Sequence, residues 1–202
     1  MREHDVNKLD NFIAGWYHDD TSICDKLIEH HRNSLTCPGE VFIPKNYDSF
    51  GGINSTVAKH IKDSEDCVLD NYDAAIEYFD WLGDAMMLYK EKYPMCNNFG
   101  PFAPVQPSII QYYRPGAAFF LWHTERINAT IPNASRHLVF MTYLNDVTDG
   151  GETEWLHQKI KIKPEKGLTV IWPADWTFTH RGCVSMTQEK YIVTGWVNYI
   201  IV

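Results

Sequence analysis

Two helical patterns of apolar residues stand out in the first half of the chain. Apolar positions recur at helical spacing after Ser22, which forms with Asp25 a sequence that resembles a capping box, so we expect a helix over about 21–33. A second helix is predicted over 71–93, where Pro94 ends the pattern. Its apolar stripe consists of Ile76, Phe79, Leu82, Met86 and Leu88 or Tyr89. Such a stripe predicts packing against a core.

From Gln106 onward the pattern changes to short apolar runs rich in β-branched and aromatic residues. In chain order these runs are PSIIQYYR, AAFFLWH, RHLVFMTYLND, QKIKIK, LTVIW and YIVTGWVNYII. Turn signals such as Pro115–Gly116 separate them. Many short strands at this spacing predict a β-sandwich or barrel, with the two helices packed outside.

We therefore predict a mainly β fold with flanking helices, formed by a single domain over 1–202. Residues 1–104 are expected to be its helical and loop-rich part, with at most one short strand in the proline- and glycine-rich stretch 36–56. Residues 105–202 are expected to be the catalytic core.

Composition and charge narrow the possible functions. A formal net charge of −8 disfavours binding to nucleic-acid backbones and to anionic membranes. No apolar stretch reaches transmembrane length, and the first residues lack the apolar segment of a signal peptide, so we expect a cytoplasmic protein without a membrane partner. Five cysteines, an odd number without a C-x-x-C motif, argue against a disulfide framework and fit a reducing compartment.

The run FFLWHTERIN contains a candidate metal-binding pair, His123 and Glu125. If this run forms a strand, the two side chains point to the same side. One such pair arises easily by chance among 9 histidines and 26 acidic residues, but the setting adds weight. His180 follows the predicted strand LTVIW, and Lys190 opens the last predicted strand. Two histidines and one carboxylate are the set with which non-haem Fe(II) oxygenases hold their metal, so we predict such a site.

Lys190 is the candidate anchor for an acidic cosubstrate beside this metal. An ammonium group at the inner end of a barrel could pair with a carboxylate. Trp196 would share the strand face of Lys190 and belongs to the same candidate cofactor-binding set. Tyr113 and Thr153 could donate hydrogen bonds to the same ligand.

The order of these motifs resembles that of the 2-oxoglutarate- and Fe(II)-dependent dioxygenases of the prolyl 4-hydroxylase type. The resemblance lies in QYYRPGAAFFLWHTE, MTYLNDVTDGGETEW, KPEKGLTVIWPADWTFTHRG and KYIVTGW, and it covers nearly half of the chain. It implies a double-stranded β-helix, or jelly roll, with Fe(II) on His123, Glu125 and His180. It also implies that Lys190 binds the distal carboxylate of 2-oxoglutarate.

Two departures from this family pattern concern single residues. The family usually has aspartate where Glu125 stands. One extra residue lies between the Tyr113 region and His123, so Tyr112 could take the role of the tyrosine that assists the cosubstrate. Tyr113 and Thr153 otherwise match the assisting positions.

The resemblance implies an oxidoreductase that hydroxylates an unactivated C–H bond with O2 and 2-oxoglutarate and releases succinate and CO2. Ascorbate is a candidate further cofactor. The expected substrate is a prolyl or other side chain in a peptide or protein, and a free amino acid or other small molecule is the alternative. Two readings from other classes stay open: a jelly-roll module that binds a metal or ligand without oxygenase activity, and a zinc hydrolase, which would have no use for Lys190. The oligomeric state stays open as well.

Overall fold

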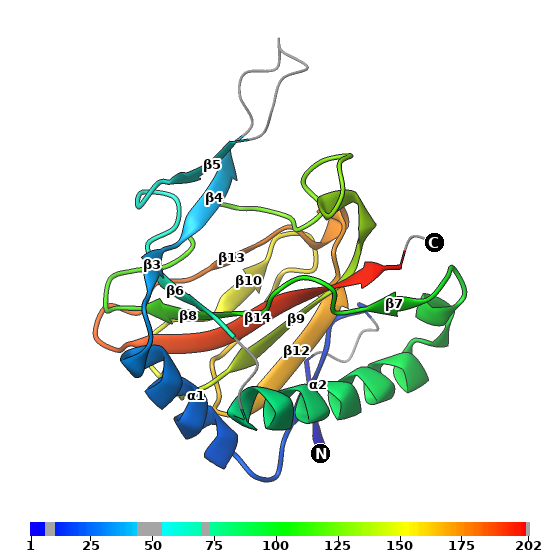
Figure 1. Ribbon diagram of the computed structural model, residues 1–202, viewed down its shortest axis with the longest axis horizontal. Coiled ribbons are helices and arrows are strands. Elements are labelled where there is room, and N and C mark those ends of the chain that lie inside the picture. Colours follow the sequence, from blue (N-terminus) through cyan, green and yellow to red (C-terminus); the bar gives the residue numbers. More distant parts are fainter. Residues whose placement is uncertain (7–10, 44–53, 70–72, 201–202) are drawn as a thin grey trace.

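A computed structural model describes residues 1–6, 11–43, 54–69 and 73–200 of the chain (Figure 1). The helices are α1 (Ser22–Asn33) and α2 (Asp73–Lys92), and short 3-10 turns are η1 (Pro94–Asn97), η2 (Asn133–Ser135) and η3 (Trp176–Phe178). The strands of the N-terminal half are β1 (Arg2–His4), β2 (Ala14–Tyr17), β3 (Cys37–Pro38), β4 (Glu40–Ile43), β5 (Asn54–Val57), β6 (Glu65–Val68) and β7 (Phe102–Ala103). Those of the C-terminal half are β8 (Ile109–Tyr113), β9 (Arg136–Tyr143), β10 (Thr153–Trp155), β11 (Ile160–Ile162), β12 (Leu168–Pro173), β13 (His180–Gly182) and β14 (Lys190–Tyr199).

Two antiparallel sheets build the molecule. The larger has the strand order β1-β2-β12-β9-β14-β8-β6-β3, with β7 paired to β14, and the smaller has the order β11-β10-β13. β4 and β5 form a separate hairpin, which projects from one end of the molecule in Figure 1. The predicted mainly β fold with flanking helices is confirmed, and it is a jelly roll of the kind that the resemblance implied.

Alternation along the central strands divides the interior into two cores. In β9, Leu138 and Phe140 belong to the core beneath the helices, whereas Val139 and Met141 belong to the core between the two sheets. This division follows from the two-residue period of a strand, which sends successive side chains to opposite faces. Both faces of the sheet are covered, which explains why the run RHLVFMTYLND is apolar almost throughout.

The two predicted helices are present, but their details differ from the sequence patterns. Thr21 makes no side-chain cap for α1, and the predicted capping box is absent; the carboxylate of Asp20 instead accepts a hydrogen bond of 2.8 Å from the backbone N–H of Ser22. In α2, Ile76 is 56% exposed, so the predicted apolar stripe is wrong at this position. The buried face consists of Ala74, Ala75, Tyr78, Trp81, Leu82, Ala85 and Tyr89. Apolar residues lie around most of α2, so spacing alone did not identify the face that packs.

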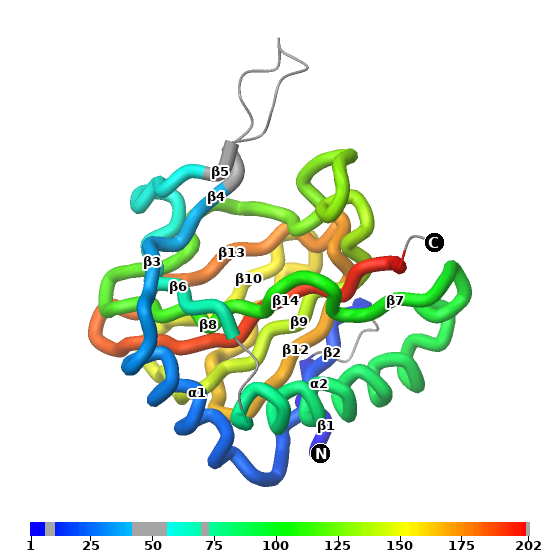
Figure 2. The backbone as a smooth tube through the Cα atoms, in the orientation of Figure 1, coloured from blue at the N-terminus to red at the C-terminus, as the bar shows by residue number. Residues whose placement is uncertain are grey.

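The N-terminal part contributes more strands than the sequence predicted. β1 and β2 extend the large sheet beside β12 (Figure 2), and β6 pairs with β8. In the stretch 36–56, where at most one short strand was expected, the structure has β3, β4 and the start of β5. That expectation was wrong, because strands of two to four residues are too short to display alternation. In contrast, the predicted strand AAFFLWH does not form; this segment makes only isolated bridges, at Phe119 to Lys62 and at His123 to His180.

Candidate metal and cosubstrate site

His123, Glu125 and His180 meet at the wall of a cavity of about 410 Å³. Oε1 of Glu125 lies 3.6 Å from Nε2 of His123 and 3.4 Å from Nε2 of His180. Metal–nitrogen and metal–oxygen bonds are each about 2 Å long, so a single ion fits between these atoms. In the part of the chain that the structure describes, no other group of histidine, cysteine and acidic side chains could hold a metal ion.

A local bridge, rather than the predicted strand, brings the two histidines together. The backbone N–H groups of His123 and His180 each donate to the carbonyl oxygen of the other residue, both at 2.9 Å. His180 is the first residue of β13 and lies opposite Trp155 in the register between β13 and β10. The ring of Phe119 stacks on the His123 ring at a centroid distance of 3.7 Å. The facing of His123 and Glu125 was therefore predicted correctly, but from a strand that does not form.

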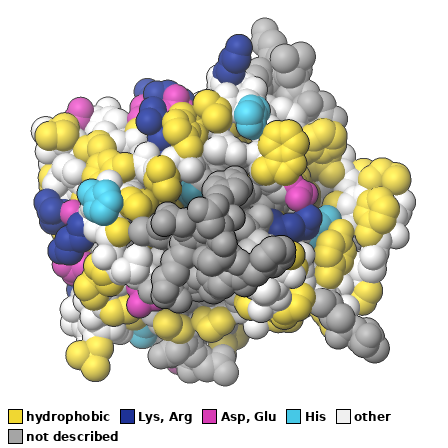
Figure 3. All heavy atoms as spheres, turned by 90° about the horizontal axis from the view of Figure 1, so that it is seen from above, with side chains coloured by type: hydrophobic (Ala, Val, Ile, Leu, Met, Phe, Trp, Pro, Cys, Tyr) yellow, Lys and Arg dark blue, Asp and Glu magenta, His cyan; other side chains and the backbone are white. Residues whose placement is uncertain are grey.

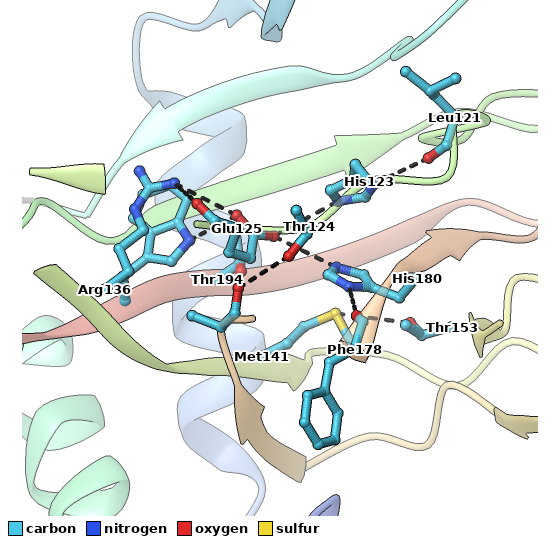
Figure 4. A network of polar contacts seen from close by, with 12 residues as sticks. Leu121, His123, Thr124, Glu125, Arg136, Met141, Thr153, Phe178, His180 and Thr194 are labelled. Atoms are coloured by element: carbon cyan, nitrogen blue, oxygen red, sulfur yellow. Dashed lines mark hydrogen bonds and ion pairs between the residues drawn. The ribbon is translucent and has the colours of Figure 1, made fainter. Parts of the chain in front are cut away.

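Backbone carbonyls orient both imidazole rings. Nδ1 of His123 is 2.9 Å from the carbonyl oxygen of Leu121, and Nδ1 of His180 is 2.9 Å from that of Phe178 (Figure 4). A carbonyl oxygen can only accept a hydrogen bond, so each Nδ1 carries the proton. The lone pair is left on each Nε2, which is the atom that faces Glu125.

The charge state of the cluster suits a divalent cation. Burial and the nearby His180 lower the pKa of His123 and favour its neutral, metal-binding form. Burial acts to raise the pKa of Glu125, but His123 and His180 outweigh it and hold that pKa well below its usual value. Two imidazole lone pairs and one carboxylate form the donor set of a non-haem Fe(II) centre, so these residues fit that metal.

The second oxygen of Glu125 has its own partners. The indole N–H of Trp196 donates to Oε2 at 2.8 Å, and Nη1 of Arg136 lies 3.6 Å from the same atom. The guanidinium of Arg136 also stacks on the Trp196 ring, 3.7 Å from its centre. Trp196 does lie on the cavity wall with Lys190, as predicted, but its N–H group is directed to Glu125. Sequence reasoning missed Arg136, because nothing in its own neighbourhood connects it to the metal motif.

Lys190 lies buried in the same cavity. Its Nζ donates to the backbone carbonyl of Gly151 at 2.9 Å and lies 5.0 Å from the centre of the Tyr113 ring. Within the described residues it has no ion-pair partner, and burial lowers its pKa to about 8. An unpaired buried ammonium group is a suitable partner for a ligand carboxylate.

Tyr113 and Thr153 line this end of the cavity, whereas Tyr112 does not. The Tyr113 hydroxyl donates to Oε1 of Gln111 at 2.8 Å, and Thr153 Oγ1 accepts a bond of 2.7 Å from Tyr143. Tyr112 points to the opposite face of β8, where its ring lies 4.7 Å from that of Tyr191. This placement favours Tyr113 over Tyr112 as the tyrosine beside the cosubstrate.

A buried polar group on the cavity wall was also missed from the sequence. Lys62 Nζ and Ser64 Oγ donate to the carboxylate of Asp66 at 2.6 and 2.7 Å. Gln111 Nε2 lies 3.5 Å from the same carboxylate. Apolar side chains of Val41, Ile61, Leu121 and Ile127 are also part of the cavity wall. The cavity thus combines a polar region with apolar surface.

Figure 3 shows one face of the molecule, on which basic and acidic side chains lie next to one another among apolar patches. This face therefore has no large area that carries charge of only one sign. Neither helix among the described residues has the length and apolar character that a membrane span requires.

Comparison with known proteins gives one family match, in the part of the chain that contains this site. Residues 108–198 match the model of the 2OG-Fe(II) oxygenase superfamily. A comparison with curated proteins gave no match. The matched stretch contains His123, Glu125, His180 and Lys190, so over these residues the chain is similar to the 2OG-Fe(II) oxygenases, a superfamily named for 2-oxoglutarate and Fe(II).

Several solved structures with a similar fold are prolyl hydroxylases. A prolyl-4-hydroxylase of Pseudomonas putida matches with a TM-score of 0.67 and 16% identity, over 93% of this chain and 92% of that one. A viral collagen prolyl hydroxylase of Paramecium Bursaria Chlorella virus-1, in complex with 2OG, matches with a TM-score of 0.65 and 18% identity, over 94% and 97%. A prolyl hydroxylase of Trichoplax adhaerens, in complex with a hypoxia inducible factor peptide fragment, matches with a TM-score of 0.70 and 14% identity, over 96% and 86%.

Proposed function

We propose that His123, Glu125 and His180 bind one Fe(II) ion and that the protein hydroxylates a side chain in a peptide or protein. The observation that carries this proposal is the convergence of the two Nε2 atoms on Oε1 of Glu125, beside a cavity that also contains Lys190. When bound, Fe(II) with 2-oxoglutarate and O2 supplies the oxidation of an unactivated C–H bond and releases succinate and CO2.

The chain's own residues bind and orient the cosubstrate. The Lys190 ammonium pairs with the distal carboxylate of 2-oxoglutarate, and burial strengthens that pairing because it excludes water. Thr153 donates a further hydrogen bond to the cosubstrate in place of its long, weak bond of 3.8 Å to the Met141 sulfur, while it keeps accepting from Tyr143. The Tyr113 ring forms part of the cavity wall, and the Lys190 ammonium group lies over this ring.

A prolyl side chain is the substrate that we favour. The similar folds are those of prolyl hydroxylases, and one of them is a complex with a peptide fragment. The cavity offers apolar surface at Val41, Leu121 and Ile127, which suits an apolar ring. A free amino acid or other small molecule is the second candidate, because a cavity of about 410 Å³ is within the size range of small-molecule sites.

We further infer that 1–202 act as one catalytic domain. Residues from both halves of the chain line the same cavity: Val41 and Lys62 come from the N-terminal part, and Lys190 comes from the last strand. Ascorbate is proposed as a supporting reductant that keeps the iron in its Fe(II) state.

Succinate formation is the test that separates these functions. Protein supplied with Fe(II), 2-oxoglutarate and O2 should form succinate, and a proline-containing peptide should increase the rate more than free amino acids do. Mass spectrometry should find one added oxygen on the peptide. Metal binding without any oxygen-dependent loss of 2-oxoglutarate would instead favour a binding module, and hydrolysis supported by Zn²⁺ would favour a hydrolase.

A further inference from the structure

The two carboxylate oxygens of Glu125 have different surroundings. Oε1 faces the Nε2 atoms of His123 and His180, at 3.6 and 3.4 Å. Oε2 faces away from them, toward Trp196 and Arg136. Figure 4 shows the Arg136 guanidinium on the side of Glu125 opposite to the two histidines. One oxygen is therefore free for a metal ion and the other is already bonded.

Arg136 and Trp196 form a clamp, by which we mean these two side chains as they contact Glu125. The clamp is rigid because each part has several contacts. Arg136 donates from Nη1 to the backbone carbonyl of Glu125 at 2.8 Å and from Nε to Oε1 of Gln106 at 3.0 Å. Its guanidinium lies flat on the indole ring, a contact that both orients the ring and adds cation–π attraction. Trp196 lies on β14, which pairs with β9 on one side and with β8 on the other in the large sheet.

The number of metal bonds made by a carboxylate depends on whether its second oxygen is available. A glutamate can bind a metal through one oxygen or through both. Hydrogen bonds to a carboxylate from N–H donors are among the stronger ones in proteins, and this carboxylate is largely screened from water. A glutamate that turned to bind through both oxygens would lose the Trp196 bond and leave a partly buried indole N–H group unpaired.

We propose that Trp196 and Arg136 are positioning residues that hold Oε2 of Glu125, so that the glutamate binds the metal through Oε1 alone. This proposal rests on the proposed function, in which His123, Glu125 and His180 are the metal ligands. Its chemical consequence is an open coordination face, since an octahedral ion with three single protein bonds keeps three positions for cosubstrate and O2. A glutamate bound through both oxygens would occupy one of those three.

Replacement of the indole by a ring without an N–H group tests the clamp. Trp196→Phe keeps an aromatic surface for Arg136 and removes the bond to Oε2. Two properties are measured in the purified protein: the dissociation constant for Mn(II), by calorimetric titration, and the visible absorption spectrum after loading with Co(II), which responds to coordination number. Loss of a partner that orients a metal ligand typically weakens metal binding by about 10–100-fold, and we expect a change of that order together with an altered Co(II) spectrum.

Trp176→Phe is the matched control. The Trp176 ring is 67% exposed and contacts the ring of His157, away from the Glu125 clamp. This variant should keep the Mn(II) dissociation constant and the Co(II) spectrum of the wild type. Thermal unfolding of both variants shows whether the fold is retained; if Trp196→Phe does not fold, Arg136→Gln takes its place and must give the same two changes.

The outcomes distinguish the clamp from the metal site itself. Failure of the wild type to bind one Mn(II) per chain would overturn the proposed function. Wild-type binding together with an unchanged dissociation constant and an unchanged Co(II) spectrum in folded Trp196→Phe would overturn the clamp alone. Weaker binding with an altered spectrum in that variant, and neither change in Trp176→Phe, would support it.

Discussion

Lys190 lies directly opposite Tyr113 in the register between β14 and β8, and its Nζ lies 5.0 Å from the centre of the Tyr113 ring. The two residues are far apart in the sequence, and the sheet makes them neighbours on the cavity wall. The ring covers the ammonium group and the backbone carbonyl of Gly151 accepts one of its protons, which leaves two N–H donors for a ligand.

Lys190→Ala should raise the concentration of 2-oxoglutarate needed for half-maximal binding by at least about tenfold. Loss of one partner of a buried charge pair costs about 2–5 kcal/mol, which corresponds to more than a tenfold change. Calorimetric titration of the Mn(II)-loaded protein with 2-oxoglutarate measures the effect. An unchanged dissociation constant would exclude the proposed role. Arg181 would be a poor substitute, because its guanidinium already pairs with Glu154 at 2.9 Å.

The binding of 2-oxoglutarate should weaken as the pH rises through about 8, the pKa to which burial lowers the Lys190 ammonium. Below that pH the lysine is charged and pairs with the carboxylate; above it the free protein loses the charge, so binding must first recover a proton. Lys190→Arg is the control, because a guanidinium stays protonated throughout this range. The same titration carried out on both sides of pH 8 should show the dependence in the wild type and none in the arginine variant. A wild-type affinity that stays constant across pH 8 would contradict a role for the ammonium group.

Tyr113→Phe should weaken 2-oxoglutarate binding only a few-fold, far less than Lys190→Ala. The Tyr113 hydroxyl donates to Gln111, so a bond to the cosubstrate would replace an existing one and the net gain would be about 0.5–1.5 kcal/mol. Tyr112→Phe is the natural comparison, since Tyr112 is the next residue of β8 and points to the opposite face. Its affinity should equal that of the wild type. A larger loss in Tyr112→Phe than in Tyr113→Phe would reverse the assignment.

His123→Ala and His180→Ala should each abolish the binding of one Mn(II) per chain and all 2-oxoglutarate turnover. Each substitution removes one of only three protein ligands, and both rings lie at the cavity wall, so the fold should persist. Metal content after dialysis and circular dichroism measure the two effects. His157→Ala is the control, because this exposed histidine contacts the Trp176 ring and lies outside the metal cluster. Full metal content in either cluster variant would exclude the proposed ligands.

Local sequence patterns were sufficient to predict several helices and strands and the types of candidate ligand. The apolar runs RHLVFMTYLND and YIVTGWVNYII, rich in β-branched and aromatic residues, and the helical spacing before Pro94 are visible within a few neighbouring residues, so β9, β14 and α2 could be predicted. The candidate ligands could be named as well, since His123, His180 and Lys190 stand at the margins of three apolar runs.

Only the tertiary structure decided which elements and side chains meet. The positions of β1, β2 and β6 in the large sheet, and the buried face of α2, depend on partners that are distant in the sequence. The bridge that aligns His123 with His180 also depends on residues that are distant in the sequence, and so does the contact of Arg136 with Trp196. A local pattern specifies which face of an element is apolar, but hydrogen bonds and stacking between distant residues are set by the packing of the whole chain.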